Sequence, residues 1–277
     1  MDLKYSVLMS VYAQENPDYL CASIKSILSQ TCVANDFVLV CDGPLTDGLN
    51  NVIGHYQTLH PELFQIIRLP KNIGIGAAAN TGLFFCRNEL VAKMDSDDIS
   101  VPERCKIQLA YFQKDNELDI VGGQIVEFWE DIRNVVSERR VPLMHQDILR
   151  YARRRSPFNN QTIMYKKSAV LSAGGYSSLR RCEDYDLYVR MLSKGCRSAN
   201  CPDVLVYYRM TEATFKRRGS LENLKCFFHI HKMAYAEGFC GFWDFLLPCA
   251  GQSVLSIMPI RARKWLYCSA LRKIRLR

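Results

Sequence analysis

Residues 90–98 read Leu-Val-Ala-Lys-Met-Asp-Ser-Asp-Asp, a short apolar run followed by three carboxylates within four positions. The apolar part predicts a buried strand, which places the carboxylates at its C-terminal end. Like charges this close repel, and burying them is costly unless a cation or hydrogen bonds compensate. Hard carboxylate oxygens suit Mg²⁺ or Mn²⁺, which also take water and phosphate oxygens. The stretch therefore indicates either a divalent-metal site or a solvated turn that caps a helix starting near Pro102.

The first hundred residues, which end with this stretch, repeat one pattern, in which a β-rich apolar run is followed by a segment of helical periodicity. This βαβαβαβ order predicts an α/β fold whose central sheet is mostly parallel and flanked by helices on both faces. Ligands of such sheets bind at the carboxyl ends of the strands, so Asp42 and Asp95 can line one crevice. The predicted strands are residues 5–11, 37–41, 64–69 and 90–94, and the predicted helices are 19–28, 49–59 and 75–85.

Beyond residue 100 the predicted order of elements becomes mixed. Gly174-Gly175 indicates a turn, and a soft domain boundary is expected near Gly219, before an aromatic-rich helical region. The predicted elements are a helix from after Pro102 to Lys114, strands at 119–126, 162–165 and 204–208, and helices at 169–173 and 183–192.

Composition favours one catalytic domain, residues 1–220, with a helical extension at 221–277. The formal net charge is +8, but residues 261–277 hold seven basic residues and no acid, which leaves 8 − 7 = +1 for the rest. Twelve cysteines without any Cys-x-x-Cys spacing fit reduced thiols, and hence a cytoplasmic setting. No signal peptide is apparent. Residues 239–260 are apolar but interrupted, which predicts a membrane-surface or core helix.

Several short motifs occur in a fixed order along the chain. They are Ser6-Val-Leu-Met-Ser-Val-Tyr12, Ser26-Ile-Leu-Ser-Gln-Thr31, Asp42-Gly-Pro44, Asn72-Ile-Gly74, Asn80-Thr-Gly82, Asp95-Ser-Asp-Asp98 and Glu183-Asp-Tyr-Asp-Leu187. By the order of these motifs the chain resembles family 2 glycosyltransferases with the GT-A fold. It looks most like the bacterial enzymes that build O-antigen, capsule and exopolysaccharide repeat units, some of which are β1,3-galactosyltransferases with an Asp-x-Asp-Asp motif. The resemblance covers roughly residues 4 to 220.

The resemblance implies that Asp95 and Asp97 form the Asp-x-Asp pair, with Asp97 the direct ligand of a Mn²⁺ or Mg²⁺ ion on the donor's diphosphate. A divalent cation stabilises the charge that a departing nucleoside diphosphate gains, so the chemistry agrees. Asp98 is expected to cap the following helix or to orient a water molecule. The resemblance also implies that Asp42 accepts hydrogen bonds from uracil or ribose, although Asp-Gly-Pro equally suits an ordinary Asx turn.

Other motif residues carry weaker implications of the same resemblance. Ser10 and Tyr12 are expected to contact the nucleotide through a hydroxyl and through ring stacking. Asn72 and Asn80 are expected to shape the nucleotide side of the cleft, with helix capping as the alternative for Asn72. Arg218, in the basic run before Gly219, is expected to reach the leaving diphosphate, and a solvated charge run is the alternative.

The start of the predicted helix at 183–192 carries two adjacent acids. By resemblance Asp184 is the base that takes the proton of the acceptor hydroxyl in an inverting transfer, and Glu183 is its neighbour. The alternative is favourable placement of acids at the positive end of a helix dipole.

These observations lead to one predicted function. It is transfer of a hexose, with galactose and a β1,3 link as the favoured detail, from a UDP-sugar to a lipid-diphosphate-linked N-acetylhexosamine or oligosaccharide. The basic tail, with Trp265 and Tyr267 among its cations, predicts peripheral attachment to an anionic membrane at the cytoplasmic face, and no motif supports nucleic-acid binding. The alternatives are a catalytically silent scaffold of a polysaccharide assembly complex and a sugar-nucleotide pyrophosphorylase.

Overall fold

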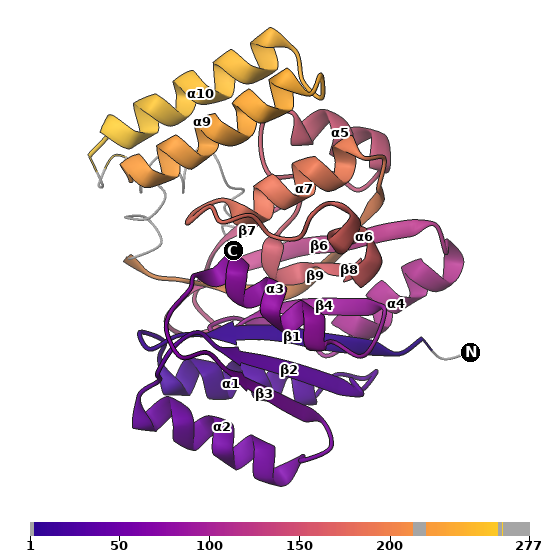
Figure 1. Cartoon of the computed structure of the whole chain (residues 1–277), viewed down its shortest axis with the longest axis vertical. Helices are drawn as coiled ribbons and strands as arrows, with labels where there is room; N and C mark the ends of the chain where they lie inside the picture. The colour runs from indigo at the N-terminus through magenta and orange to yellow at the C-terminus, as the bar shows by residue number, and fades with distance from the viewer. Residues whose placement is uncertain (1–2, 213–219, 260–261, 263–277) are drawn as a thin grey trace.

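The computed structural model of the 277-residue chain describes residues 3–212, 220–259 and 262. Its centre is one sheet with the strand order β3-β2-β1-β4-β8-β6-β9-β5, and β7 pairs with β6 beside this path (Figure 1). The strands are β1 Tyr5–Val11, β2 Asp36–Cys41, β3 Phe64–Arg68, β4 Leu90–Asp95, β5 Ile99–Ser100, β6 Leu118–Trp129, β7 Val135–Arg139, β8 Met164–Lys166 and β9 Arg197–Met210.

Helices follow or separate most of the strands. Each helix that was predicted with bounds lies within a few residues of its prediction, but the helix His145–Ala152 was not predicted. The prediction for residues 75–85 agrees at both ends, where Gly74 precedes the helix and Cys86 follows it. The helices are α1 Pro17–Leu28, α2 Asp47–Leu59, α3 Ile75–Phe85, α4 Arg104–Lys114, α5 His145–Ala152, the 3-10 turn η1 Asn160–Thr162, α6 Lys167–Ser172, α7 Glu183–Ser193, α9 Leu221–Ala236 and α10 Phe242–Ile257.

The predicted α/β architecture is confirmed, and β1 to β4 pair in parallel. The second half of the chain makes the sheet mixed, because β8 runs antiparallel to both β4 and β6. Strands β6 and β9 are each much longer than predicted, and they pair in parallel along most of their length. In β9, Asn200, Pro202 and Asp203 had hidden the part before residue 204. The side chain of Asn200 is nevertheless paired there, because it donates to the backbone carbonyls of Pro142 and Pro157.

Helices cover both faces of the sheet because residues of the buried strands point alternately to either side. In β1, Val7 and Met9 join a core shared with α1, α2 and α4. Leu8 points the other way and joins a core shared with α3, α5, α6 and α7. Gly82 of α3 lies so close to this face that an added Cβ would stand 2.4 Å from a methyl carbon of Leu8. Glycine there lets α3 approach the sheet.

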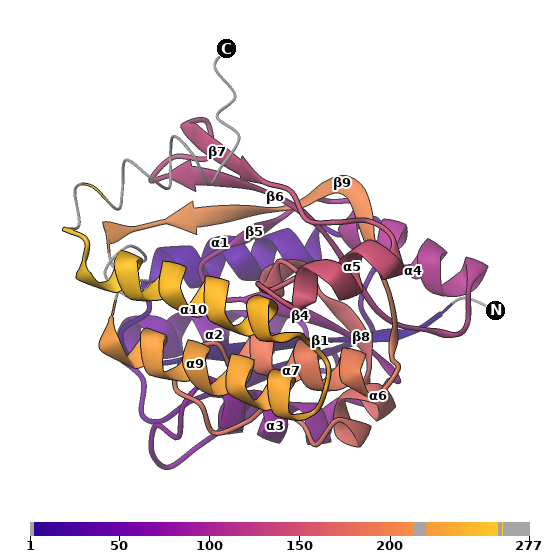
Figure 2. The same ribbon diagram turned by 90° about the horizontal axis from the view of Figure 1, so that it is seen from above.

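The last two described helices form a layer of their own on top of α7 (Figures 1 and 2). Tyr185 and Val189 of α7 pack in a third apolar cluster with Ile230 and Ala234 of α9, and α10 packs beside α9. Within the described residues, no helix is both long enough and apolar enough to cross a membrane. The predicted boundary near Gly219 falls outside the described residues.

Candidate active site

Strand β4 ends at Asp95, and its last residues bring a cation and a carboxylate together. The Lys93 side chain is 2% exposed although it carries a charge, and its Nζ lies 3.0 Å from a carboxylate oxygen of Asp95. A buried ammonium needs such a partner. The backbone of Asp95 is held as well, because the Ser23 hydroxyl of α1 donates a hydrogen bond to the Asp95 carbonyl. The first carboxylate of the acidic stretch is therefore fixed in position.

The turn after Asp95 is clamped by a residue far along the chain. Arg209 in β9 donates from its backbone N–H to the Asp98 carboxylate and from Nε to the Asp97 carbonyl, at 2.8 and 2.9 Å. Its guanidinium lies 3.9 Å from the ring centre of Tyr19 and 4.7 Å from that of Phe128. Arg209 thus holds the turn, and the rings of Tyr19 in α1 and Phe128 in β6 hold the Arg209 guanidinium in place.

Asp98 is fully buried, and it is not a helix cap. The first residue of α4 is Arg104, preceded by Glu103 without any side-chain cap. Burial raises the pKa of Asp98 well above its usual value, and the charges of Asp97 and Asp95 add to this effect. The predicted capping role for Asp98 is therefore wrong, because the strand pairing of β5 with β9 carries its carboxylate inward instead. Asp97 is half-buried at the same turn.

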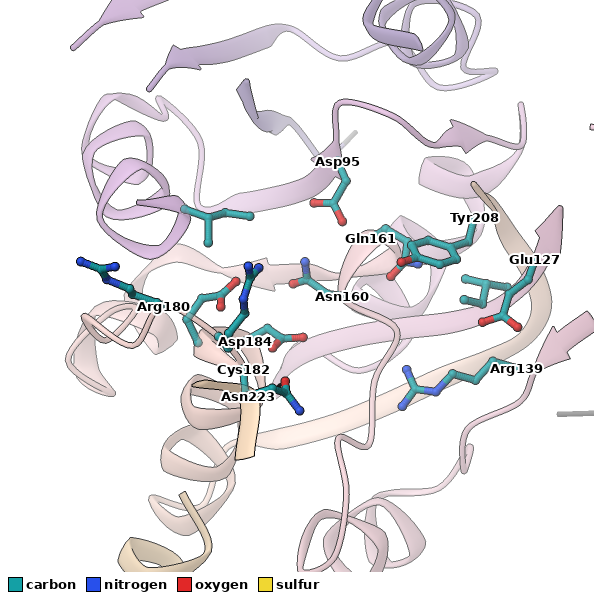
Figure 3. A pocket seen from close by; sticks show the side chains of 14 residues that line it. Asp95, Glu127, Arg139, Asn160, Gln161, Arg180, Cys182, Asp184, Tyr208 and Asn223 are labelled. Atoms are coloured by element: carbon teal, nitrogen blue, oxygen red, sulfur yellow. Dashed lines mark hydrogen bonds between the residues drawn. The ribbon is translucent and has the colours of Figure 1, made fainter. Parts of the chain in front are cut away.

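On the opposite side of the site, α7 begins with Glu183 and Asp184. The residue before them, Cys182, has φ = 56°, a left-handed conformation that is rare for a residue with a side chain. The first two residues of the helix line the same cavity as Asp95 of β4. Figure 3 shows Asp184 and Arg139 of β7 pointing toward one another from opposite sides of the cavity, with Asp95 above them in the view.

Both acids at the start of α7 are less acidic than ordinary carboxyls. Burial, followed by the charge of Asp184, raises the pKa of Glu183 to about 7, although the Lys93 ammonium opposes the shift. Burial also raises the pKa of Asp184, while Arg139 opposes the rise and the Asp95 charge supports it. A carboxylate with a raised pKa is a stronger base, which is the property that proton abstraction requires.

Asp95 and the two acids of α7 line one cavity of about 300 Å³. Its walls are polar and carry three arginines, one of which, Arg139, is held by carbonyls of Ser156 and Phe158 and by the amide oxygen of Asn159. The remaining lining residues are Ile75, Ile125, Glu127, Asn160, Gln161, Arg180, Arg181, Cys182, Tyr208 and Asn223.

Asp42 stands at the end of β2, where it organises a neighbouring loop. Its carboxylate accepts hydrogen bonds from the backbone N–H groups of Ile73 and Gly74, at 2.7 and 3.1 Å. These residues lie in another loop, so the alternative of a local Asx turn does not hold. Asn72 donates to the Asp42 carbonyl and does not cap α3, whose capping position is Gly74. The helix-capping alternative for Asn72 is therefore wrong.

The other predicted nucleotide contacts are dispersed around the same edge. Ser10 pairs in register with Asp95 of β4, and its buried hydroxyl oxygen has no hydrogen-bond partner among the described residues. Tyr12 follows β1 and is 41% exposed. Asn80 exchanges two hydrogen bonds of 2.8 Å with the backbone of Tyr176, so it ties α3 to the loop before α7. Arg218 lies outside the described residues.

Most of the residues that line the cavity were not predicted from sequence motifs. Arg139, Asn160 and Asn223 come from β7, η1 and α9, and none stands in a motif with a spacing of its own. Lys93 did carry a signal, since a lysine inside the apolar run 90–94 is unusual unless an acid is nearby. The wall residues become neighbours only through the pairing of strands.

The donor atoms at the end of β4 fit a Mg²⁺ or Mn²⁺ ion that is also bound by phosphate. Among the described residues, no three His, Cys, Asp or Glu side chains group closely enough to hold a metal alone. Mg²⁺ commonly uses one or two carboxylates and takes its other oxygens from water and substrate phosphates. Asp95 and Asp97 supply such a pair on one turn, and their oxygens are hard ligands.

Comparison with known proteins agrees with this geometry. The profile of Glycosyl transferase family 2 matches residues 6–182. Amylovoran biosynthesis glycosyltransferase AmsE from Erwinia amylovora is 34% identical over 263 residues, which are 95% of this chain and 97% of AmsE. The Escherichia coli UDP-Gal:alpha-D-GlcNAc-diphosphoundecaprenol beta-1,3-galactosyltransferase is 31% identical over 275 residues, 98% of this chain and 97% of that enzyme.

A solved structure extends the comparison to the fold. The mannosyltransferase PcManGT from Pyrobaculum calidifontis, in complex with GDP-Man and Mn²⁺, superposes with a TM-score of 0.63 at 18% identity and covers 97% of this chain and 79% of its own. The likeness shows a shared GT-A fold. Together with the matched profile and with relatives of nearly equal length, it establishes that the chain belongs to glycosyl transferase family 2.

Proposed function

We propose that this protein is an inverting, metal-dependent transferase that moves galactose from UDP-galactose to a lipid-diphosphate-linked N-acetylhexosamine in a β1,3 link. One observation carries the proposal: Asp95 at the end of β4 and Asp184 at the start of α7 line the same cavity. The similarity to a β1,3-galactosyltransferase with a diphosphoundecaprenol acceptor supports the choice of donor, acceptor and linkage. The similarity to an amylovoran biosynthesis enzyme supports a role in bacterial surface polysaccharide.

The proposed reaction divides the cavity between donor and acceptor. Asp95 and Asp97 would hold a Mn²⁺ or Mg²⁺ ion, which would stabilise the charge that UDP gains as it leaves. Asp42, Ser10 and Tyr12 lie nearer the ends of β1 and β2, which suits contacts with the nucleoside. Lys93 balances the carboxylates of the site, because its ammonium lies against Asp95.

Asp184 acts on the acceptor in this scheme. One of its oxygens takes the proton of the acceptor hydroxyl while that hydroxyl oxygen forms a bond with the anomeric carbon of galactose. The bond from that carbon to the β-phosphate oxygen breaks on the opposite side, and UDP leaves with the electron pair. Attack and departure on opposite faces invert the anomeric centre. Arg139 faces Asp184 and steadies its ionised form, since its charge lowers the pKa of that carboxyl.

Calorimetric titration with UDP-galactose, with and without Mn²⁺, tests the assignment of donor and metal. We expect binding that strengthens at least about tenfold when Mn²⁺ is present, because the diphosphate and the carboxylates repel each other without a cation. Titration with GDP-mannose is the matched control for nucleotide selectivity. A catalytically silent scaffold would show no metal-dependent binding of any sugar nucleotide, and that result would refute the proposal.

We also propose that the protein is peripheral at the cytoplasmic face of the bacterial inner membrane, where residues 261–277 approach anionic lipid. These residues lie outside those that the structure describes, apart from Ala262, so the argument rests on their sequence. Seven cations stand there among Trp265, Leu266 and Tyr267. Each cation near an anionic surface contributes about 1 kcal/mol, so together they supply several kcal/mol of attraction.

Removal of residues 261–277 is therefore expected to move much of the protein from the membrane to the soluble fraction, without loss of transfer to a short water-soluble acceptor. Binding of the full chain should weaken as salt rises, since the Debye length is only about 8 Å at physiological ionic strength. Membrane fractionation across a salt series measures both effects. If the truncated chain stays fully membrane-bound at low salt, residues 261–277 are not required for attachment.

A further inference from the structure

The outward side of α10 is an apolar stripe that runs the length of the helix. The exposed residues recur at intervals of three and four, which is the period of one helix face. Trp243 is 64% exposed, Val254 60% and Ile257 86%. No charged or hydrogen-bonding side chain interrupts the series, apart from the indole N–H of the tryptophan. The stripe comprises Trp243, Leu246, Leu247, Ala250, Gly251, Val254 and Ile257.

The other side of α10 already has its partners. Phe245 packs against Phe228 and Tyr235 of α9, with ring centres 6.5 and 5.9 Å apart. Asp244, the one charged residue of this helix, accepts a hydrogen bond of 2.6 Å from Arg154. The side of α10 that packs on α9 is therefore different from the side that carries the stripe. The exposure of the stripe is not the result of incomplete packing between the two helices. Figures 1 and 2 show α9 and α10 together as the outermost layer of the molecule.

Cations stand beside this layer. Lys225 and Lys232 are exposed on α9, seven residues apart and hence on one face of that helix. Arg153 is exposed after α5, and its charge acts on Cys240 in the turn that joins α9 to α10. Apolar side chains on one helix with basic side chains around them are the pattern of a helix that lies in the interface of an anionic bilayer.

We propose that the stripe of α10 contacts the bilayer directly, with the helix lying along the surface and its seven stripe residues among the lipid headgroups and upper acyl chains. The proposal rests on the proposed function, whose acceptor is a membrane lipid. A second copy of the chain fits the stripe less well, because pairing two such faces would bring Lys225, Lys232 and their counterparts together. A row of exposed apolar side chains marks an interaction surface, and the exposed Lys225 and Lys232 on the neighbouring helix favour anionic lipid as its partner.

The test compares two triple variants of the full chain by flotation with vesicles. One variant removes the stripe: Trp243→Gln, Leu247→Gln and Val254→Gln. The matched control makes the same kind of change at exposed apolar residues elsewhere: Phe84→Gln, Leu171→Gln and Val33→Gln, which are 77%, 55% and 68% exposed. The vesicles contain phosphatidylglycerol and phosphatidylcholine in one series and phosphatidylcholine alone in the other.

We expect the stripe variant to lose about tenfold or more of its partitioning into the phosphatidylglycerol vesicles, because burial of large apolar side chains drives interfacial binding. The control variant should bind like the parent, and all proteins should bind phosphatidylcholine alone more weakly. Transfer to a water-soluble acceptor should be unchanged in both variants, which separates this proposal from the proposed function. Circular dichroism confirms folding, and Trp243→Gln alone provides a milder variant.

Several outcomes would overturn the proposal. Equal losses in the stripe variant and the control variant would show a nonspecific effect of apolar surface. Unchanged binding of the stripe variant would exclude the stripe from attachment and assign it to residues 261–277. A parent dimer in sedimentation that the stripe variant dissociates would make the stripe an interface between two copies.

Discussion

Asp184→Asn is expected to lower kcat by about 10² to 10⁴-fold while the affinity for UDP-galactose changes little. The amide cannot accept the proton of the acceptor hydroxyl, and this loss is felt in the transition state rather than in donor binding. Steady-state kinetics with a soluble acceptor, together with calorimetry for the donor, separates the two effects. Asp47→Asn is the matched control, because Asp47 occupies the first turn of α2 and does not line the cavity.

Measuring the activity of the parent and of the Asp184→Asn variant across pH gives a second test of Asp184 as the base. The base must be ionised to accept a proton, and the pKa of Asp184 is raised by burial. Activity of the parent should therefore fall as pH decreases, and it should do so at a pH above that at which an ordinary aspartate titrates. The residual activity of the Asp184→Asn variant should lack this decline. A loss of only a few-fold, with the decline retained, would leave Asp184 as a helix-dipole residue.

The configuration of the product provides an independent check on the role of Asp184. Attack from the face opposite to UDP turns the α-linked galactose of the donor into a β-linked product. Proton NMR coupling constants of the anomeric hydrogen distinguish the two forms. An α-linked product would contradict direct in-line attack, and with it the need for a single base.

Asp97→Asn is expected to reduce transfer by about 100-fold or more and to weaken Mn²⁺-dependent binding of UDP. The amide has lost the charge that a hard cation requires, whereas the clamp from Arg209 remains because it bonds the Asp97 backbone carbonyl. Calorimetry with UDP and Mn²⁺ and an activity assay measure the effect. If the variant binds UDP with Mn²⁺ as tightly as the parent does, Asp97 is not a ligand.

Stability of the metal-free protein should hold or rise slightly in the same variant. The charge of Asp97 helps to raise the pKa of buried Asp98. A carboxyl whose pKa is higher in the folded state than in the unfolded state costs stability once pH exceeds its unfolded value. Removal of the Asp97 charge reduces that cost at neutral pH. Thermal unfolding without metal measures it, and a marked fall in Tm would indicate that Asp97 supports the turn instead.

Several features of this protein follow from the sequence by itself. The bounds of β1 and α3 agree with the sequence prediction, because the spacing of apolar residues that distinguishes a strand from a helix can be read from adjacent positions. The place of Asp95 at the end of a strand and of Glu183 at the start of a helix follows for the same reason. Hydrogen bonding within an element is local, so its residues suffice to indicate it.

The tertiary structure decided the surroundings of those residues. The carboxylate of Asp98 looked like a helix cap in the sequence, but it accepts the N–H of Arg209, 111 residues away. Arg139 and Asn160 reached the cavity by strand pairing across β6 and β8 rather than by any spacing along the chain. For residues 239–260 the sequence left a surface helix and a core helix open, because both are equally apolar.

The packing of α10 answers this question in part. Its Phe245 side packs against α9, as in a core helix, whereas the stripe on its other side stays exposed. The spacing of apolar residues and the composition of a segment are local properties, and they are the same whatever the segment packs against. Which side chains meet, which are buried and which charges compensate each other depend on elements that are far apart in sequence. Those contacts form only when the sheet assembles, and they gave Asp184 its raised pKa and Lys93 its buried partner.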